Sequence, residues 1–208
     1  MLTAEEANRR YFEAAYRTGQ HGWEVETPSP YAMRFLKRLV RLVPGGVRQA
    51  HPALSLSKGG KLLDIGCGEG RHAIAAAQMG FQVTAVDFEP RALQRARRFA
   101  GLQGMKGIKF RRADVFRLPF RDAAFDVALD YGCLHHQRKS DWPAYRASVL
   151  RVLKPQGFYV LSVFSPAFRF FRGSRQPWHI AHGAYRRCFT SEDIARLFGS
   201  HFEVLEMA

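Results

Sequence analysis

Residues 62–87 read LLDIGCGEGRHAIAAAQMGFQVTAVD, and this stretch decides the fold. Two short apolar runs, 62–66 and 81–87, flank an alanine-rich segment that begins at Arg71 and ends before Gly80. Such runs are typical of buried strands, and the segment between them is typical of a helix, so the stretch predicts a strand–helix–strand unit. A glycine-rich loop follows the first run, where α/β sheets bind their ligands.

The same alternation continues along the chain. Further strands are predicted at 108–114, 125–132, 158–165 and 201–208, and further helices at 4–17, 31–43, 90–100, 142–153 and 191–198. Strands that alternate with helices of about ten residues form parallel sheets with helices on both faces. The sequence therefore predicts a doubly wound α/β fold, and the residues that follow each strand become the candidates for function.

Composition and charge limit the classes of protein to which the chain could belong. The chain has 208 residues, a net charge of +14 and 47% hydrophobic residues, which fits one folded domain and excludes a disordered chain. No apolar run approaches 18 residues, and the N-terminus lacks the apolar core of a secretory signal, so no membrane partner is expected. Cys67, Cys133 and Cys188 lack metal-ligand spacing, which predicts no metal and a reducing, cytoplasmic location.

The first loop carries glycines at positions 66, 68 and 70, and Asp64 lies just before them. Glycine allows a sharp turn and a close approach to a ligand. An acid at this point repels a pyrophosphate and suits a cationic ammonium group instead. The alternative is that the glycines form a plain turn.

Acids also follow the next two predicted strands. Asp87 could accept hydrogen bonds from ribose hydroxyls, or it could cap the helix that starts near Pro90. Asp114 could accept a hydrogen bond from an adenine amino group, or it could cap its own loop. Three consecutive strand ends with acids indicate one shared site.

Four segments resemble the motifs of class I S-adenosylmethionine-dependent methyltransferases. They are LLDIGCGEGRHA (62–73), VTAVD (83–87), RRADVFRLPFRDAAFDVALDYGCLHH (111–136) and LRVLKPQGFYVLSVF (150–164). The resemblance implies a Rossmann-like sheet, S-adenosylmethionine as cofactor and S-adenosylhomocysteine as product. Its final antiparallel strand is missing from the predicted pattern, so we expect pairing with a second copy of the chain at that sheet edge.

The resemblance also implies roles for individual residues. The cofactor would be held by Asp64, Gly66, Cys67, Gly68, Asp87, Phe88, Asp114, Val115 and Asp130. In this set Gly66, Cys67 and Gly68 would contact the methionine part largely through their backbone, and Asp130 would contact its ammonium group through either its backbone carbonyl or its side chain.

DYGCLHH (130–136) is similar to a pattern of the small-molecule branches, including thiopurine- and tellurite-type methyltransferases. We therefore expect in-line methyl transfer to a small acceptor such as a thiol, an oxyanion or another small nucleophile. His135 and His136 are the candidates to orient or deprotonate the acceptor, and Tyr131 lies at the same strand end. One histidine could instead only bond to the backbone.

The domain organisation follows from these assignments. We expect a helical lid at 1–46, an inserted flexible loop at 47–60 and the methyltransferase core at 61–208. The aromatic and basic stretch 165–190 would cover the acceptor, with Trp178 and His179 beside it.

Two other functions remain open. Residues 91–121 hold ten Lys and Arg against one acid, which could serve a methyltransferase that acts on RNA or another nucleic acid. The other alternative is a protein that binds the cofactor without catalysis.

Overall fold

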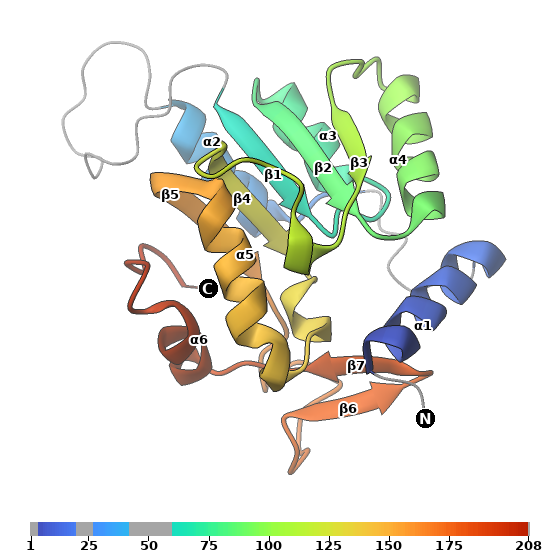
Figure 1. The fold of residues 1–208 in the computed structure, drawn as a ribbon, viewed down its shortest axis with the longest axis vertical. Coiled ribbons are helices and arrows are strands. Elements are labelled where there is room, and N and C mark those ends of the chain that lie inside the picture. Colours follow the sequence, from blue (N-terminus) through green and yellow to red (C-terminus); the bar gives the residue numbers. More distant parts are fainter. Residues whose placement is uncertain (1–3, 20–26, 42–59, 208) are drawn as a thin grey trace.

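The computed structural model describes residues 4–19, 27–41 and 60–207. Five strands form one parallel sheet in the order β3-β2-β1-β4-β5 (Figure 1). Their bounds are β1 Lys61–Ile65, β2 Gln82–Asp87, β3 Lys109–Arg112, β4 Phe125–Tyr131 and β5 Leu153–Ser162. The strand order reverses between β1 and β4, which places a ligand crevice outside their carboxyl ends.

Helices cover both faces of this sheet, as predicted. Their bounds are α1 Ala4–Thr18, α2 Pro30–Arg41, α3 Arg71–Gln78, α4 Pro90–Leu102, α5 Trp142–Val152 and α6 Ser191–Phe198. Residues of α2, α3 and α4 bury one face together with Leu62, and residues of α5 and α6 bury the other together with Leu63. Neighbouring strand residues point to opposite faces, which explains why Leu62 and Leu63 of β1 are both apolar. None of the described helices has the length and apolar character needed to cross a membrane.

A small antiparallel hairpin, β6 Trp178–Ala181 and β7 Ala184–Arg187, lies beside α1 at the carboxyl end of the sheet (Figure 1). The sequence pattern predicted a loop there. The two connecting residues, His182 and Gly183, both have positive φ, at 51° and 85°. Such a turn matches the twist of a hairpin, but His-Gly is not the usual Asn-Gly signal. In the described chain, the 3-10 turn η2 Val115–Arg117 follows β3, and η3 Leu134–His136 and η4 Lys139–Asp141 lie in turn between β4 and α5.

The strand predicted at 201–208 is wrong, because residues 201–207 contain no strand. Phe202 packs against Tyr159 of β5 instead, and Glu206 forms ion pairs with Arg34 and Arg38 of α2. Through these contacts, residues 201–207 cross from the face of the sheet covered by α6 to the face covered by α2. They do not pair with β5 as a strand. In the described chain the main sheet therefore ends at β5, and association through that edge stays a prediction.

Two boundaries differ from the prediction in a smaller way. The helix expected to reach residue 153 ends at Val152, and β5 starts at once at Leu153. The strand expected to begin at residue 158 thus begins earlier and contains an irregularity at Gln156, which has a φ of 62°, where the pairing with β4 shifts register.

Candidate functional site

A cavity of about 670 Å³ opens at the carboxyl ends of β1 to β4. The glycine loop after β1 and the turns after β2, β3 and β4 form its floor, while α1, β7 and residues 164–170 complete its walls. The strand ends that the sequence singled out thus share one space. Such a volume is ordinary for a small-molecule site.

The glycine loop has no room for side chains. Gly66 and Gly68 have φ values of 66° and 54°, in the left-handed region that glycine adopts without strain. A Cβ on Gly66 would lie 3.0 Å from the Cβ of Cys133, and one on Gly68 would lie 3.0 Å from the Tyr16 hydroxyl. The loop is therefore more than a plain turn, because it is packed against the turn after β4 and against α1.

Asp64 lies in β1 just below this loop and lines the cavity. Its side chain is only 2% exposed, and among the described residues its Oδ2 has no hydrogen-bond partner. Burial, followed by the charges of Asp130 and Asp87, raises the pKa of Asp64 to about 7. A buried carboxyl group with a free oxygen suits a cationic ligand, which would supply the missing partner.

Asp87, at the end of β2, also lines the cavity. Its two oxygens accept hydrogen bonds from the N–H groups of Gly68 at 2.8 Å and Glu89 at 2.9 Å. Burial raises its pKa to about 6. The N-cap of α4 is Glu89, whose side chain accepts from the N–H of Arg91, so Asp87 is not the helix cap.

Asp114, after β3, caps its own turn by accepting the N–H of Phe116 at 2.9 Å. Its other oxygen accepts a hydrogen bond from Arg9 of α1 at 2.7 Å. The guanidinium of Arg9 also lies over the ring of Phe88, 5.4 Å from its centre. Asp114, Val115 and Phe88 all line the cavity, so the expected adenine-binding residues are adjacent to α1.

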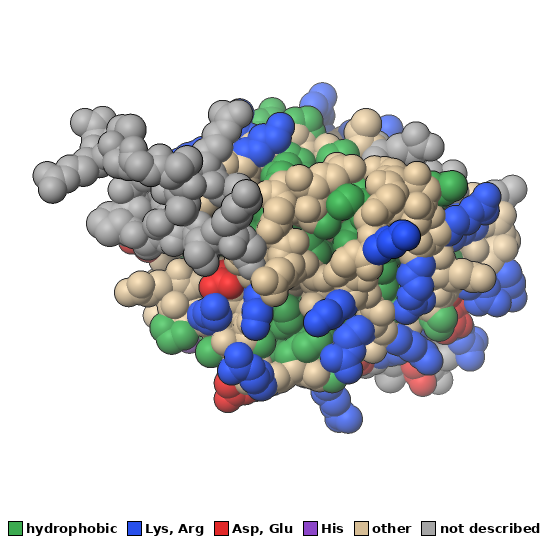
Figure 2. Space-filling model, turned by 90° about the horizontal axis from the view of Figure 1, so that it is seen from above, with side chains coloured by type: hydrophobic (Ala, Val, Ile, Leu, Met, Phe, Trp, Pro, Cys, Tyr) green, Lys and Arg blue, Asp and Glu red, His purple; other side chains and the backbone are tan. Residues whose placement is uncertain are grey.

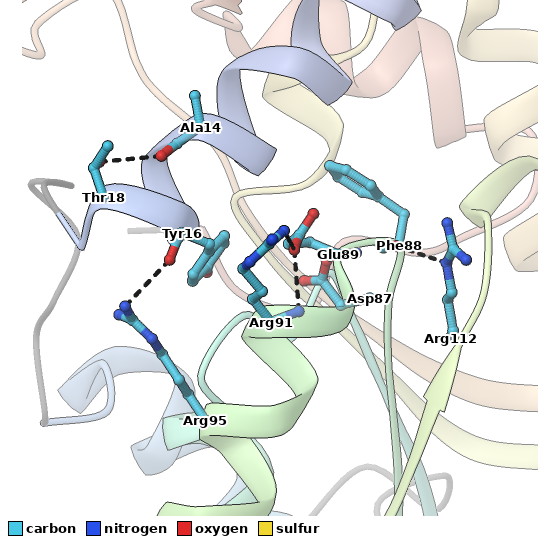
Figure 3. A network of polar contacts seen from close by, with 9 residues as sticks. All are labelled: Ala14, Tyr16, Thr18, Asp87, Phe88, Glu89, Arg91, Arg95 and Arg112. Atoms are coloured by element: carbon cyan, nitrogen blue, oxygen red, sulfur yellow. Dashed lines mark hydrogen bonds and ion pairs between the residues drawn. The ribbon is translucent and has the colours of Figure 1, made fainter.

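The helix α1 is held over the cavity by contacts at several points. Asn8 donates a hydrogen bond to the carbonyl of His136 and accepts one from the N–H of Tyr185, both at 2.7 Å. Arg95 of α4 donates to the carbonyl of Tyr16 (Figure 3). Of the segment 1–46 expected to form a lid, α1 covers the site, whereas α2 packs in the core.

Sequence reasoning had assigned no role to the α1 side chains. Asn8, Phe12 and Tyr16 recur at intervals of four and all line the cavity. This polar and aromatic stripe on one face of the helix is the sequence pattern that could have predicted their place in the cavity wall. Residues 1–3, 20–26 and 42–59 of the expected lid and insert lie outside the described residues.

Asp130 is fully buried, but it does not line the cavity. Its carboxylate accepts hydrogen bonds from the N–H groups of Cys133 at 2.6 Å and Leu134 at 3.1 Å, and from the hydroxyls of Tyr145 and Tyr159. Burial raises its pKa to about 6. The side chain is thus committed to fixing the turn after β4, and the structure does not bring it to the ligand space.

The two histidines after β4 line the cavity in different ways. His136 Nδ1 donates to the carbonyl of Tyr185 at 2.8 Å, and burial lowers its pKa to about 4. His135 stacks on Phe164 with ring centres 3.9 Å apart, and its buried Nδ1 has no partner in the described chain. Burial lowers the pKa of His135 as well, so both rings are neutral at pH 7.

Residues 165–190 contribute to the cavity wall, but not through the residues that the sequence predicted. Trp178 is 42% exposed and stacks on Tyr185, while His179 packs on Phe171, and neither lines the cavity. The residues of this stretch that line it are Ser165, Phe168, Arg169, Phe170 and Arg186. Tyr131 lines it as expected, together with His72, which the sequence analysis did not single out.

Cys67 and Cys133 line the cavity as thiols, because burial raises the pKa of each well above its ordinary value. Burial of this kind makes a cysteine a small apolar filler. Among the described residues, no group of three or more His, Cys, Asp or Glu side chains is arranged to hold a metal ion.

Comparison with known proteins adds to this geometry. Residues 62–157, from β1 into β5, match a family described as "Methyltransferase domain". An uncharacterized methyltransferase of Synechocystis is 31% identical over 147 residues, or 67% of this chain and 64% of its own length. The 2-heptyl-1-hydroxyquinolin-4(1H)-one methyltransferase of Mycobacteroides abscessus is 26% identical over 163 residues, or 75% of this chain and 64% of its own length. The chain thus spans just under two thirds of these curated relatives.

Among solved structures, one similar protein is the 1,6-didemethyltoxoflavin-N1-methyltransferase of Burkholderia thailandensis. It is 27% identical, with a TM-score of 0.68 over 96% of this chain and 79% of its own. That crystal structure holds 1,6-didemethyltoxoflavin and S-adenosylhomocysteine.

Proposed function

The chain carries a domain of the S-adenosylmethionine-dependent methyltransferase family, and from that premise we propose that it methylates a small-molecule acceptor. The observation that carries the proposal is the buried carboxyl group of Asp64. Its Oδ2, which no described residue satisfies, lies beneath a glycine loop in a cavity whose other end is aromatic. A cationic cofactor and a flat acceptor would complete these two ends.

The residues fit the cofactor at several points. Asp64 offers a carboxylate to an ammonium group, and the glycine loop leaves its backbone accessible. The oxygens of Asp87 each accept one N–H, and because a carboxylate oxygen has a second acceptor position, Asp87 keeps capacity for ribose hydroxyls. Phe88, Asp114 and Val115 offer a ring face and an acceptor to adenine. Asp130 would act indirectly, by fixing the turn that closes on Gly66.

S-adenosylmethionine supplies a methyl group on a positively charged sulfur. The chain contributes alignment and exclusion of water, which are the main needs of an in-line displacement. The helix α1 covers the cavity between Phe88 and the glycine loop. Its Phe12 packs on both Phe88 and His136. The neutral rings of His135 and His136 can orient an acceptor without adding charge beside it.

The size and walls of the cavity favour a small, flat acceptor. Phe164, Phe168 and Phe170 contact one another at the end away from the glycine loop, with ring centres 4.6 to 6.1 Å apart. The relatives named above act on a hydroxyquinolone and a didemethyltoxoflavin, which are both ring compounds. This supports a ring compound over a thiol or an inorganic oxyanion.

A nucleic-acid acceptor has less support from the structure. Several cations of the basic stretch 91–121 are engaged locally: Arg95 pairs with Glu69, and Arg97 and Arg112 donate to backbone carbonyls. Lys and Arg side chains are spread over the end of the molecule that faces away from the β6–β7 hairpin (Figure 2). That end lies away from the cavity, so its charge would not guide a strand to the reacting groups.

Calorimetry with S-adenosylmethionine and S-adenosylhomocysteine, followed by a transfer assay with labelled methyl, tests the proposal. We expect the wild type to bind both and to label a hydroxylated or N-heterocyclic ring compound but not bulk RNA. Asp87→Ala should bind the cofactor more weakly. Absence of cofactor binding would refute the enzyme, and binding without transfer to any acceptor class would favour a non-catalytic protein.

A further inference from the structure

The acidic side chains that line the cavity gather at one end, where Arg9 and Arg71 also line it. The carboxylates that line its described part are Asp64, Glu69, Asp87 and Asp114, and each lies in or after β1, β2 or β3. The opposite end carries Arg169 and Arg186, and no acid of the described chain lines that end. A cationic ligand therefore fits the first end, and the second end fits a ligand of opposite charge.

Arg186 has the better defined position of these two arginines. It is half-buried on β7 and donates a hydrogen bond to the Tyr11 hydroxyl at 3.2 Å. Its guanidinium also lies 5.3 Å from the centre of the Phe170 ring. Among the described residues no ion pair joins Arg186 to a carboxylate, and its guanidinium contacts ring faces and a phenol.

Arg186 belongs to a closed circuit of side chains that all line the cavity. The successive contacts run through Phe12, His136, His135, Phe164, Phe168, Phe170, Arg186 and Tyr11, and return to Phe12. The members come from α1, η3, the segment after β5, and β7. This circuit offers flat ring faces beside a cation that pairs with no carboxylate of the described chain. Such a combination suits a flat ring that carries a negative charge.

The same surroundings lack a strong base among the described residues. The titratable groups that face Arg186 are Tyr11 on α1, His135 and His136 on η3 and His179 on β6. Burial, together with the charge of Arg186, lowers the pKa of each histidine, so they hold a proton weakly. An acceptor that had to lose its proton in the site would find little help.

We propose that the acceptor is a planar aromatic anion, a ring compound whose nucleophilic oxygen or nitrogen is ionised before it binds, and that Arg186 selects it by its charge. This rests on the proposed methyl transfer. The ionised atom forms the new bond to the methyl carbon as the carbon–sulfur bond breaks, and sulfur keeps that electron pair. No proton moves, and the negative ring and positive sulfur both become neutral.

Because the negative charge is lost during this step, Arg186 stabilises the bound anion more than the transition state. Arg186 is thus a specificity-determining residue, whose loss weakens binding of the anion and leaves the chemical step unimpaired. The binding of an anionic probe therefore measures its role directly, without turnover.

The probe is 4-nitrophenol, because its ionised form has its own visible absorption band, and 4-nitroanisole is its uncharged counterpart. Both are titrated by calorimetry and absorbance against the wild type, Arg186→Gln, Arg186→Lys and Arg172→Gln, with and without S-adenosylhomocysteine. Arg172→Gln is the control, because Arg172 is exposed, belongs to the same stretch 165–190 and does not line the cavity.

We expect the wild type to prefer the anion and to lower the pKa of the bound phenol. Arg186→Gln should weaken binding of the anion about tenfold, as for a lost hydrogen bond to a charged group, and leave 4-nitroanisole unchanged. Arg186→Lys should restore part of the preference, and Arg172→Gln should match the wild type.

Equal affinity for the two probes, or the same preference in Arg186→Gln, would overturn the proposal. Binding of S-adenosylhomocysteine in the same samples reports separately on the proposed function. If the wild type prefers the anion but does not bind S-adenosylhomocysteine, the methyltransferase assignment fails while the anion site stands.

Discussion

Arg9 of α1 donates a hydrogen bond to Asp114 after β3 at 2.7 Å, and this pair ties the covering helix to the rim of the cavity. Both side chains are about one third exposed. The pair lies beside Phe88, the residue expected to contact adenine, so we expect it to restrain exchange of the cofactor. The contact therefore bears on the rate of exchange more than on the chemistry.

Arg9→Gln should speed the release of S-adenosylhomocysteine. A partly exposed ion pair contributes up to about 1 kcal/mol, which limits the increase to roughly fivefold. Stopped-flow measurement of the release rate checks this. Arg10→Gln makes the same chemical change at an exposed neighbouring position and should leave the rate unchanged. Equal release rates in both variants and the wild type would mean that α1 is not held closed by this pair.

Gly66→Ala should abolish cofactor binding. The new Cβ would lie 3.0 Å from the Cβ of Cys133, so the loop or the turn after β4 must shift. Gly104→Ala is the matched control, because Gly104 has a similar φ of 71° and an added methyl group there would meet nothing within 4 Å in the described chain. Calorimetry should show loss in the first variant and normal affinity in the second. If both variants bind normally, the close packing of the glycine loop does not matter for the cofactor.

The strand ends were predictable because buried parallel strands are short apolar runs that end in glycines or acids. Asp64 lies within the first of these runs, Asp87 ends the second and Asp114 follows β3, and all three line the cavity. Asp130 lies near the end of a similar run, but it does not line the cavity. The hydrogen bonds that Asp130 accepts from Tyr145 and Tyr159 could not be predicted from the local pattern, because these tyrosines come from later elements.

Contacts between distant segments were not predictable from local patterns. Asn8 joins η3 and β7, which are 128 and 177 residues further along the chain. The tail at 201–207 reads as a strand by its alternating apolar residues, yet Glu206 pairs with α2 and Phe202 packs on Tyr159. In both places the structure of the segment depends on which distant residues the fold brings into contact with it. The spacing of apolar residues along the sequence does not contain that information.

Asp130→Asn should lower the stability of the protein without a direct effect on ligand contacts. An amide in place of the carboxylate turns one acceptor into a donor that faces the N–H group of Cys133 or that of Leu134, according to its orientation. Buried unpaired groups cost about 1–3 kcal/mol, and each kcal/mol lowers Tm by roughly 2–4 °C in a chain of this size. Thermal unfolding checks the shift.

The control for this variant is Asp122→Asn, which alters an exposed ion pair with Arg151. It should change Tm by less than the Asp130 variant, because exposed pairs contribute little. A Tm of Asp130→Asn equal to the wild type would show that the four hydrogen bonds to this carboxylate do not fix the turn.

Asp64→Asn should make the protein without cofactor more stable at pH 7.5. The pKa of Asp64 rises from 3.8 in the unfolded chain to about 7 in the folded one. Between these values the folded state binds more protons, so this group reduces stability as the pH rises through that window. The variant removes the penalty. Its gain in Tm over the wild type should therefore grow from pH 5 to pH 7.5.

Affinity for S-adenosylmethionine should respond to the same group in the opposite direction. An ammonium ligand prefers the ionised carboxylate, so wild-type affinity should increase as the pH rises from 5.5 to 7.5, whereas Asp64→Asn should bind weakly throughout. Asp87 and Asp130 have pKa values of about 6 and titrate in the same range. The difference between wild type and variant at each pH isolates Asp64, because the other two acids are present in both. A constant difference across this range, measured by calorimetry, would show that the ligand does not use the charge of Asp64.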